Sequence, residues 1–202
     1  IRFIYLRRLE SYLSLKRKRD VIEYPPDKLW DINGWDLAKA LRLFRKSNPP
    51  LLEWLQSPIV YKEWGTLATK LRSFAREYFS PKASIYHYLR MAEGNYESYL
   101  KRERVKLKKY FYVLRPLLAC RWIESRGEPA PIRFQELTDC LPTDGPVRGI
   151  VSNLLASKKQ SSERGSAPVI PELNSFLADE IAYFKELAGG QAVSEPIDWN
   201  IL

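Results

Sequence analysis

The chain has 202 residues, of which 45% are hydrophobic and 13% aromatic, enough to fill a core and to exclude a wholly disordered protein. No apolar run approaches the ~18 residues that span a bilayer, and two cysteines with one histidine provide neither a disulfide framework nor a zinc ligand set. The net charge of +9 is uneven, because residues 1–126 carry 27 Lys and Arg against 13 Asp and Glu (+14), whereas residues 127–202 carry 6 against 11 (−5).

The first predicted element is a strand over residues 1–7. Its opening run, Ile1 to Leu6, is rich in apolar residues, and neither an initiator Met nor a turn precedes it. A strand that begins at full hydrophobicity indicates a piece of a longer protein, trimmed just before a strand. We therefore expect the chain to lack part of its sheet.

Short elements follow up to residue 61. A helical turn is predicted over 9–15, and strands over 21–24 and 29–32, with Asn33-Gly34 as the next turn. Apolar residues at helical spacing predict an amphipathic helix over 35–46. A short helix over 51–56, opened by Pro49 or Pro50, and an extended segment over 59–61 complete this half.

Helical periodicity dominates the remainder. Helices are predicted over roughly 63–79, 81–100, 103–125, 133–140, 146–159 and 171–188, with Pro116 kinking or dividing the third, and 157–167 is the best linker candidate. We expect an α+β protein with a mixed sheet of three or four strands within 1–61, backed by the 35–46 helix, and no sheet beyond residue 65. The predicted domains are 1–61 and a helical domain, 62–202.

Two carboxylates in predicted strands are the candidate metal ligands. Asp31 lies between Trp30 and Ile32, and Glu23 lies between Ile22 and Tyr24. Hard oxygen ligands on rigid elements suit divalent cations. Each acid either faces solvent or points into a metal site, and one carboxylate alone does not hold Mg²⁺ against water.

The basic segment 101–124 is the candidate phosphate site. At ~100° per residue, Lys101, Lys108, Tyr112 and Arg115 share one narrow strip of a helix. A second strip, which we expect to face the core, comprises Phe111, Leu114, Leu118 and Trp122. The cationic strip either clamps a polyphosphate, with Tyr112 stacking on a base, or forms a solvated basic face.

Other polar residues are expected to be structural. His87 is predicted to pack within a helix, and Cys120 to act as a small buried hydrophobe. Asn48 is predicted to make a turn or cap, and Glu53 to lie in the first turn of the next helix. Two cysteines and no leader pattern favour a reducing cytoplasm.

Several runs of residues taken together carry a family resemblance. They are Arg2-Phe3-Ile4-Tyr5, Arg19-Asp20-Val21-Ile22-Glu23-Tyr24, Asp31-Ile32-Asn33-Gly34-Trp35-Asp36-Leu37, Lys46-Ser47-Asn48-Pro49-Pro50-Leu51-Leu52-Glu53-Trp54-Leu55, Ser57-Pro58-Ile59-Val60-Tyr61, Phe79-Ser80-Pro81-Lys82 and Lys108 to Ala119. Over roughly residues 1–180 the chain resembles predicted nucleotidyltransferases of the DNA polymerase beta superfamily, in the branch associated with RNA repair.

The resemblance implies a metal-dependent nucleotidyltransferase, with residues 1–61 as the C-terminal part of its palm-like domain. It places a Gly-Ser pair and an Asp-x-Asp pair upstream of Ile1, so only the third metal carboxylate is present. Asp31 is the choice for that catalytic and metal-binding role, and Glu23 is the reserve. Implied cofactors and partners are Mg²⁺ or Mn²⁺, a nucleoside triphosphate and an RNA acceptor, with no membrane.

The nucleotide would be bound by Lys108, Lys109, Tyr112 and Arg115. Lys108 and Lys109 point ~100° apart on a helix, so we expect one of them, Lys108, to face the nucleotide. Two other readings stay open: a non-catalytic nucleic-acid-binding module that uses the basic helix 101–115, and a toxin–antitoxin or scaffold protein. The nucleotide, the acceptor and the oligomeric state do not follow from the sequence.

Overall fold

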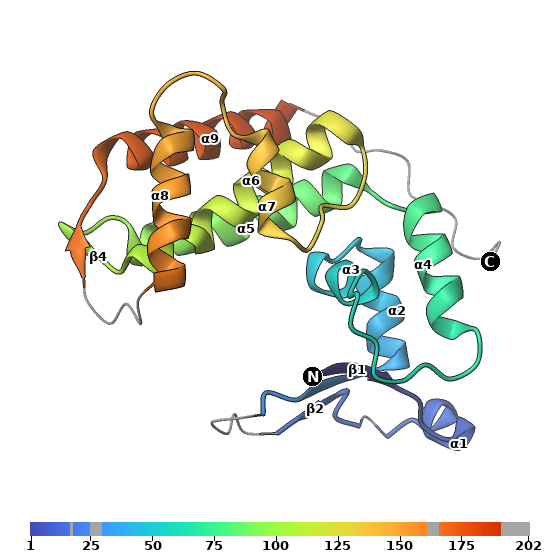
Figure 1. The fold of residues 1–202 in the computed structure, drawn as a ribbon. Helices are drawn as coiled ribbons and strands as arrows, with labels where there is room; N and C mark the ends of the chain where they lie inside the picture. Colours follow the sequence, from blue (N-terminus) through green and yellow to red (C-terminus); the bar gives the residue numbers. More distant parts are fainter. Residues whose placement is uncertain (17, 25–29, 161–165, 191–202) are drawn as a thin grey trace. The chain divides into compact units, whose positions relative to one another are not determined.

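The computed structural model describes residues 1–16, 18–24, 30–160 and 166–190 of the chain (Figure 1). Its elements are β1 (Arg2–Tyr5), α1 (Leu9–Leu13), β2 (Val21–Glu23), β3 (Asn33–Asp36), α2 (Leu37–Arg45), α3 (Pro49–Leu55), α4 (Leu67–Glu77), α5 (Pro81–Tyr99), β4 (Arg104–Val105), the 3₁₀ turn η1 (Leu107–Lys109), α6 (Tyr110–Arg126), α7 (Phe134–Leu137), the 3₁₀ turn η2 (Thr138–Cys140), α8 (Val147–Gln160), β5 (Ala167–Pro168) and α9 (Pro171–Gly190). The predicted α+β class is confirmed.

The chain forms two compact units that are interleaved in sequence. The first contains the described residues of 1–87 together with 122–137, and the second contains 88–121 with the described residues from 138 onward. The predicted domains, 1–61 and 62–202, are consecutive, and that division stays a prediction. Among the described residues, no helix has the length and apolar character needed to cross a membrane.

The first unit contains a three-stranded mixed sheet in the order β1-β3-β2. The central strand β3 pairs in parallel with β1 and antiparallel with β2. The sheet packs against α2 and α3, and the rings of Trp35 in β3 and Trp54 in α3 stack with centroids 3.8 Å apart (Figure 1). The predicted mixed sheet within residues 1–61, with a helix behind it, is therefore confirmed.

The position of the third strand was predicted wrongly. Residues 30–32 form no strand, residue 29 lies outside the described residues, and Asn33-Gly34 opens β3 instead of making a turn. The ring of Phe3 on β1 lies over Gly34, where an added Cβ would sit 2.3 Å from its Cζ atom. A glycine inside a strand suits such a close approach, so cross-strand packing overrides the turn preference.

Side-chain caps fix where the two helices behind the sheet begin. The Asp36 carboxylate accepts a hydrogen bond from the backbone N–H of Ala38 at 2.9 Å, which moves the start of α2 to Leu37 from the predicted residue 35. The Asn48 side chain accepts from the backbone N–H of Leu51 at 3.3 Å, ahead of Pro49 and Pro50. The predicted capping role of Asn48 is confirmed.

Glu53 was placed wrongly. Because α3 begins at Pro49, Glu53 is its fifth residue and lies beyond the first turn. The extended segment predicted over 59–61 also forms no strand.

The second unit packs several helices around a buried α6. Val113, Leu114, Leu117 and Leu118 on this helix have no exposed surface, and neither do Leu173, Leu177 and Phe184 on α9. Arg121 on α6 forms a two-pronged ion pair with Glu180 on α9, at 2.7 and 2.6 Å. Pro116 lies inside α6 without dividing it. Of the four residues of the predicted core strip, Leu114 and Leu118 are buried, and Phe111 and Trp122 are half-buried.

A second, two-stranded sheet contradicts the expectation that no sheet forms beyond residue 65. Arg104 and Val105 pair with Ala167 and Pro168, and the guanidinium of Arg104 donates to the carbonyl of Ser166 at 2.6 Å. This partner is about sixty residues away, so pattern within 101–110 could not reveal it. Of the predicted linker 157–167, residues 161–165 lie outside the described residues, 157–160 continue α8 and 167 belongs to β5.

Candidate functional site

A cluster of polar side chains lies at one end of the mixed sheet. Arg2 of β1 and Glu23 of β2 both pair in register with Asn33 of β3. Residues paired in register point to the same face of a sheet, and Asp31, which precedes β3, is tied to this end by its hydrogen bond from Arg2. The fold therefore brings the two predicted carboxylates, Asp31 and Glu23, to the same end of the sheet.

Each member of this polar cluster has a defined contact. The Arg2 guanidinium donates to the Asp31 carboxylate at 2.7 Å, and the Asn33 amide donates to Glu23 at 2.9 Å. The guanidinium of Arg19 lies 3.6 Å from Glu23. The hydrogen bond from Arg2 holds the pKa of Asp31 below its ordinary value, so Asp31 is ionised at neutral pH.

The cluster offers part of a divalent-metal site. Asp31 and Glu23 supply the hard oxygen atoms that Mg²⁺ prefers, and the side chain of Asp31 is 68% exposed, so a cation can reach it. The Oδ1 atom of Asn33 is buried and has no hydrogen-bond partner among the described residues. Residues 1–16, 18–24, 30–160 and 166–190 contain no group of three or more His, Cys, Asp or Glu able to hold a metal ion. Among the described residues, Asp31 and Glu23 could therefore supply one or two of the ligands of such an ion.

Asp36, which sequence reasoning left inside a helix, is the buried carboxylate of this sheet. Its side chain is 5% exposed and accepts hydrogen bonds from Arg7 at 3.0 Å and from the Tyr12 hydroxyl at 3.2 Å, besides capping α2. These contacts join β3 to the segment after β1. Asp36 is therefore a structural anchor, and its hydrogen-bonding capacity is largely used.

The four predicted nucleotide-binding residues lie in the second unit. Lys108 and Lys109 belong to the 3₁₀ turn η1, and Tyr112 and Arg115 to the first turns of α6. The prediction of one helix over 103–125 is wrong because β4 extends the chain at 104–105 and α6 begins only at Tyr110. The single strip that also included Lys101 does not exist. The alternative function, a nucleic-acid-binding module that uses a basic helix over 101–115, also assumed a continuous helix that does not form.

Lys109 is held by aromatic rings. Its ammonium nitrogen lies 3.6 Å from the ring centroid of Tyr99 and 4.3 Å from that of Tyr112. Lys108 is exposed, whereas Arg115 is half-buried. The roles of these four residues stay predictions. Lys108 is more accessible to solvent than Lys109.

His87 lies half-buried on α5, which agrees with its predicted packing within a helix. Burial lowers its pKa below the ordinary value of 6.5, and the positive charge of Lys46 lowers it further. A neutral imidazole is consistent with packing. Cys120 is buried, as expected for a small hydrophobe.

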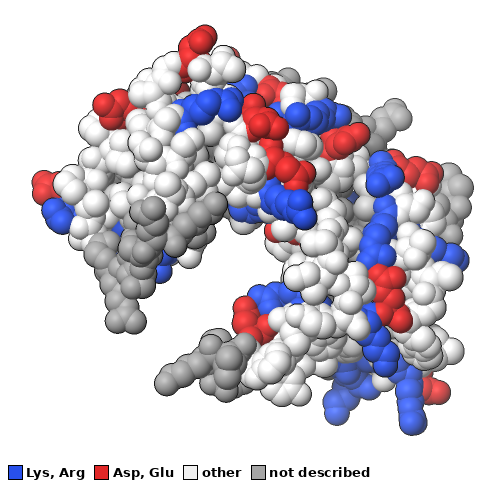
Figure 2. All heavy atoms as spheres, in the orientation of Figure 1, with Lys and Arg blue, Asp and Glu red and all other residues white. Residues whose placement is uncertain are grey.

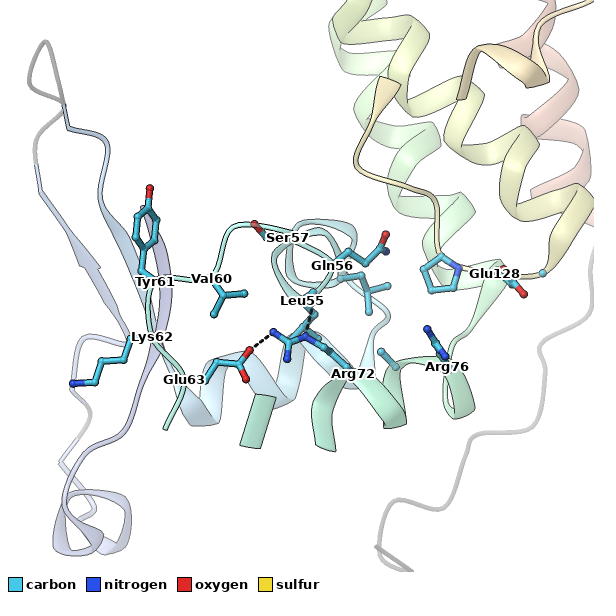
Figure 3. A pocket seen from close by; sticks show the side chains of 14 residues that line it. Leu55, Gln56, Ser57, Val60, Tyr61, Lys62, Glu63, Arg72, Arg76 and Glu128 are labelled. Carbon is cyan, nitrogen blue, oxygen red and sulfur yellow. Dashed lines mark hydrogen bonds and ion pairs between the residues drawn. The ribbon is translucent and has the colours of Figure 1, made fainter. Parts of the chain in front are cut away.

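A pocket that sequence reasoning missed lies elsewhere in the first unit (Figure 3). Its volume is about 1260 Å³, and its lining comes from the end of α3, the loop after it, α4 and residues 127–129. Arg72 on α4 donates to the carbonyl of Leu55 at 2.9 Å and pairs with Glu63. That pairing holds the pKa of Glu63 below its ordinary value.

Comparison with known protein families identifies one that covers the whole chain. The sequence matches the family described as RlaP, RNA repair pathway DNA polymerase beta family, over residues 1–202. It is 47% identical over 188 residues to the uncharacterized protein YcgL of Bacillus subtilis (strain 168), a match that covers 93% of this chain and 72% of that protein. No solved structure matches significantly.

Proposed function

The chain belongs to the RNA repair pathway DNA polymerase beta family, and on that premise we propose that it is a nucleotidyltransferase that moves a nucleoside monophosphate from a nucleoside triphosphate to a hydroxyl group of an RNA acceptor. The observation that carries this proposal is the pair of carboxylates, Asp31 and Glu23, at one end of the mixed sheet. The polymerase beta type of family gives the reaction class at a coarse level, and the acceptor follows from the association with RNA repair.

The transfer makes one bond and breaks one bond. The acceptor hydroxyl oxygen bonds to the α-phosphorus while the bond from that phosphorus to the α–β bridging oxygen breaks, and pyrophosphate leaves with the electron pair. The hydroxyl proton needs an acceptor. In this proposal the exposed carboxylate of Asp31 takes that proton.

A divalent cation, Mg²⁺ or Mn²⁺, would neutralise the charge of the triphosphate when bound. In this proposal Asp31 is its first ligand among the described residues, and Glu23 is the second. Arg2 holds the Asp31 carboxylate toward the sheet and keeps it ionised before a cation arrives. Glu23 is held in the same way by the Asn33 amide.

Nucleotide binding is proposed for the residues predicted from the sequence. Lys108 and Arg115 would contact the phosphates, and Tyr112 the base or sugar. Lys109 would support Tyr112, because its ammonium already lies over that ring. Each charge-assisted contact to a phosphate is worth about 1.5–3 kcal/mol, or roughly 10- to 150-fold in affinity.

The test of catalysis uses the protein expressed from its whole natural gene, incubated with labelled nucleotides, Mg²⁺ and a short RNA. Asp31→Asn should lower the rate of transfer by about two orders of magnitude or more, because a ligand and a proton acceptor are lost together. Asp20→Asn is the matched control, since Asp20 also pairs with cations of the first unit, Lys39 and Arg42. Equal rates for Asp31→Asn and wild type would contradict the proposed role.

The test of nucleotide binding uses equilibrium affinity in the presence of Mg²⁺. Lys108→Ala and Arg115→Ala should each weaken binding by roughly tenfold or more. Lys16→Ala is the control, because Lys16 is exposed on the first unit. If both variants bind as tightly as wild type while Lys16→Ala binds weakly, the nucleotide site is assigned to the wrong unit.

A further inference from the structure

The loop between α3 and α4 exposes an unusual set of large side chains. Ile59, Val60, Tyr61 and Trp64 are 67, 52, 76 and 86% exposed. Buried cores normally take such residues, so four of them within six positions mark an interaction surface. We name Tyr61, Lys62, Trp64, Arg72 and Arg76 the loop–α4 surface.

Cations accompany the exposed rings on this surface. Arg72 and Arg76 lie one helical turn apart on the same face of α4, and both line the pocket. Figure 2 shows basic side chains gathered along α4. Neither Lys62 nor Arg76 has a side-chain hydrogen bond or an ion pair within the part of the chain that the structure describes. Their charges are therefore available to an anionic ligand.

Arg72 fixes the shape of the pocket. Its guanidinium joins the end of α3, through the Leu55 carbonyl, to Glu63 in the loop (Figure 3). Figure 3 places Tyr61 and Lys62 at one end of the pocket and Arg76 with Glu128 at the other. A ligand that meets both ends must be extended, with flat groups for the rings and negative charge for the cations.

We propose that the loop–α4 surface binds single-stranded RNA, with Tyr61 and Trp64 stacking on bases and Arg76 and Lys62 contacting phosphates. Aromatic platforms interleaved with cations are the arrangement by which proteins hold single strands without reading their sequence. This surface would hold the acceptor strand, so that role rests on the proposed nucleotidyl transfer. The binding itself does not depend on catalysis.

The position of the surface suits an acceptor strand. Helix α3 contributes Trp54 to the stack with Trp35 of β3, and the next residue, Leu55, lines the pocket. Asp31 lies four residues before Trp35, about 13 Å along an extended chain. One helix therefore links the pocket to the strand that leads back to the candidate catalytic carboxylate.

The experiment measures fluorescence anisotropy of a labelled single-stranded oligouridylate, without nucleotide or divalent metal. Trp64→Ala should weaken binding by about fivefold or more, the low end of the effect of losing one stacked base. Trp64→Phe keeps a ring and should restore most of the affinity. Arg76→Ala should weaken binding and reduce the dependence of log affinity on log salt by about 0.7, the value for one phosphate contact on a single strand.

Lys70→Ala is the matched control. Lys70 is exposed on α4 but lies ~200° around the helix from Arg72, on the opposite face. It should therefore bind RNA as wild type does. Circular dichroism of each variant checks that α4 and its neighbours remain folded.

Three results would overturn the proposal. The first is that the wild-type protein does not bind the oligonucleotide in low salt. The second is that Trp64→Ala and Arg76→Ala both bind with the affinity of the wild type. The third is that the wild-type protein self-associates and that Trp64→Ala dissociates it with RNA affinity unchanged, which would assign the surface to protein contact. RNA binding without transfer activity would refute the proposed function alone. Transfer activity with unaltered binding by both variants would refute this surface alone.

Discussion

Replacing Gly34 with alanine should destabilise the mixed sheet that Asp31 leads into. An added Cβ would lie 2.3, 2.4 and 2.8 Å from three atoms of the Phe3 ring, closer than the 3.0 Å that real Cβ atoms respect. The ring must therefore swing away, or strands β1 and β3 must separate. Either movement disrupts the packing of the Phe3 ring against Gly34 in the central strand.

The expected magnitude follows from two opposing effects. Forcing an extra methyl group into a packed position costs about 1–3 kcal/mol. Removing a glycine from a strand returns about 0.5–1 kcal/mol, because the unfolded chain loses conformational freedom. We therefore expect Gly34→Ala to lower the free energy of unfolding by about 1–2 kcal/mol.

A double-mutant cycle with Phe3→Ala isolates the clash. Without the ring, Gly34→Ala should cost nothing or stabilise by up to ~1 kcal/mol, so the sign of the effect reverses. Urea unfolding followed by tryptophan fluorescence is the assay, because Trp35 and Trp54 stack next to Gly34. The same cost in both backgrounds, or no cost in the wild-type background, would refute the reasoning.

Three further predictions concern residues outside the candidate catalytic cluster. Ser47→Ala should cost about 1–3 kcal/mol in urea unfolding, because the backbone N–H of the half-buried Ser80 loses its acceptor at 2.8 Å. Ser47→Gly should cost less, since Ser47 has a φ of 47°. Glu180→Gln should cost about 2–3 kcal/mol in thermal unfolding, less than the ~3–5 kcal/mol of a fully buried pair, because Arg121 is 30% exposed. A cost below ~1 kcal/mol would show that the pair contributes little. The pKa of the single histidine, His87, measured by NMR, should lie below 6.5. The unfolded state then binds more protons than the folded state, so stability should fall as the pH drops through 6.5, and His87→Gln should remove this dependence. A measured pKa at or above 6.5 would contradict burial of the imidazole.

Local patterns were sufficient to predict most helices and their caps. The Asn48-Pro49-Pro50 run predicts the start of a helix by itself, because an N-cap side chain and proline at the first positions act within one turn. The long apolar periodicities of α5, α6 and α9 likewise outweigh single unfavourable residues such as Pro116. These features depend on neighbours within a few residues.

Features that depend on distant partners were not predictable. Asn33-Gly34 is a strong turn signal, and only the ring of Phe3, thirty-one positions earlier, explains its place in a strand. Val105 is extended because it pairs with Ala167. Asp31 was selected as a carboxylate of a predicted strand that residues 30–32 do not form, and its contact with Arg2 requires the register of β1 against β3.

Nucleotidyl transfer is tested most sharply by following the two ends of the nucleotide. The full-length natural protein would be incubated with an RNA oligonucleotide, Mg²⁺ and triphosphate labelled either at the α- or at the γ-phosphate. A nucleotidyltransferase that uses Asp31 should attach the α-label to the RNA and release the γ-label as pyrophosphate. Asp31→Asn should abolish the transfer, whereas Asp20→Asn should not. A γ-label on the RNA, or undiminished α-label transfer by Asp31→Asn, would contradict this mechanism.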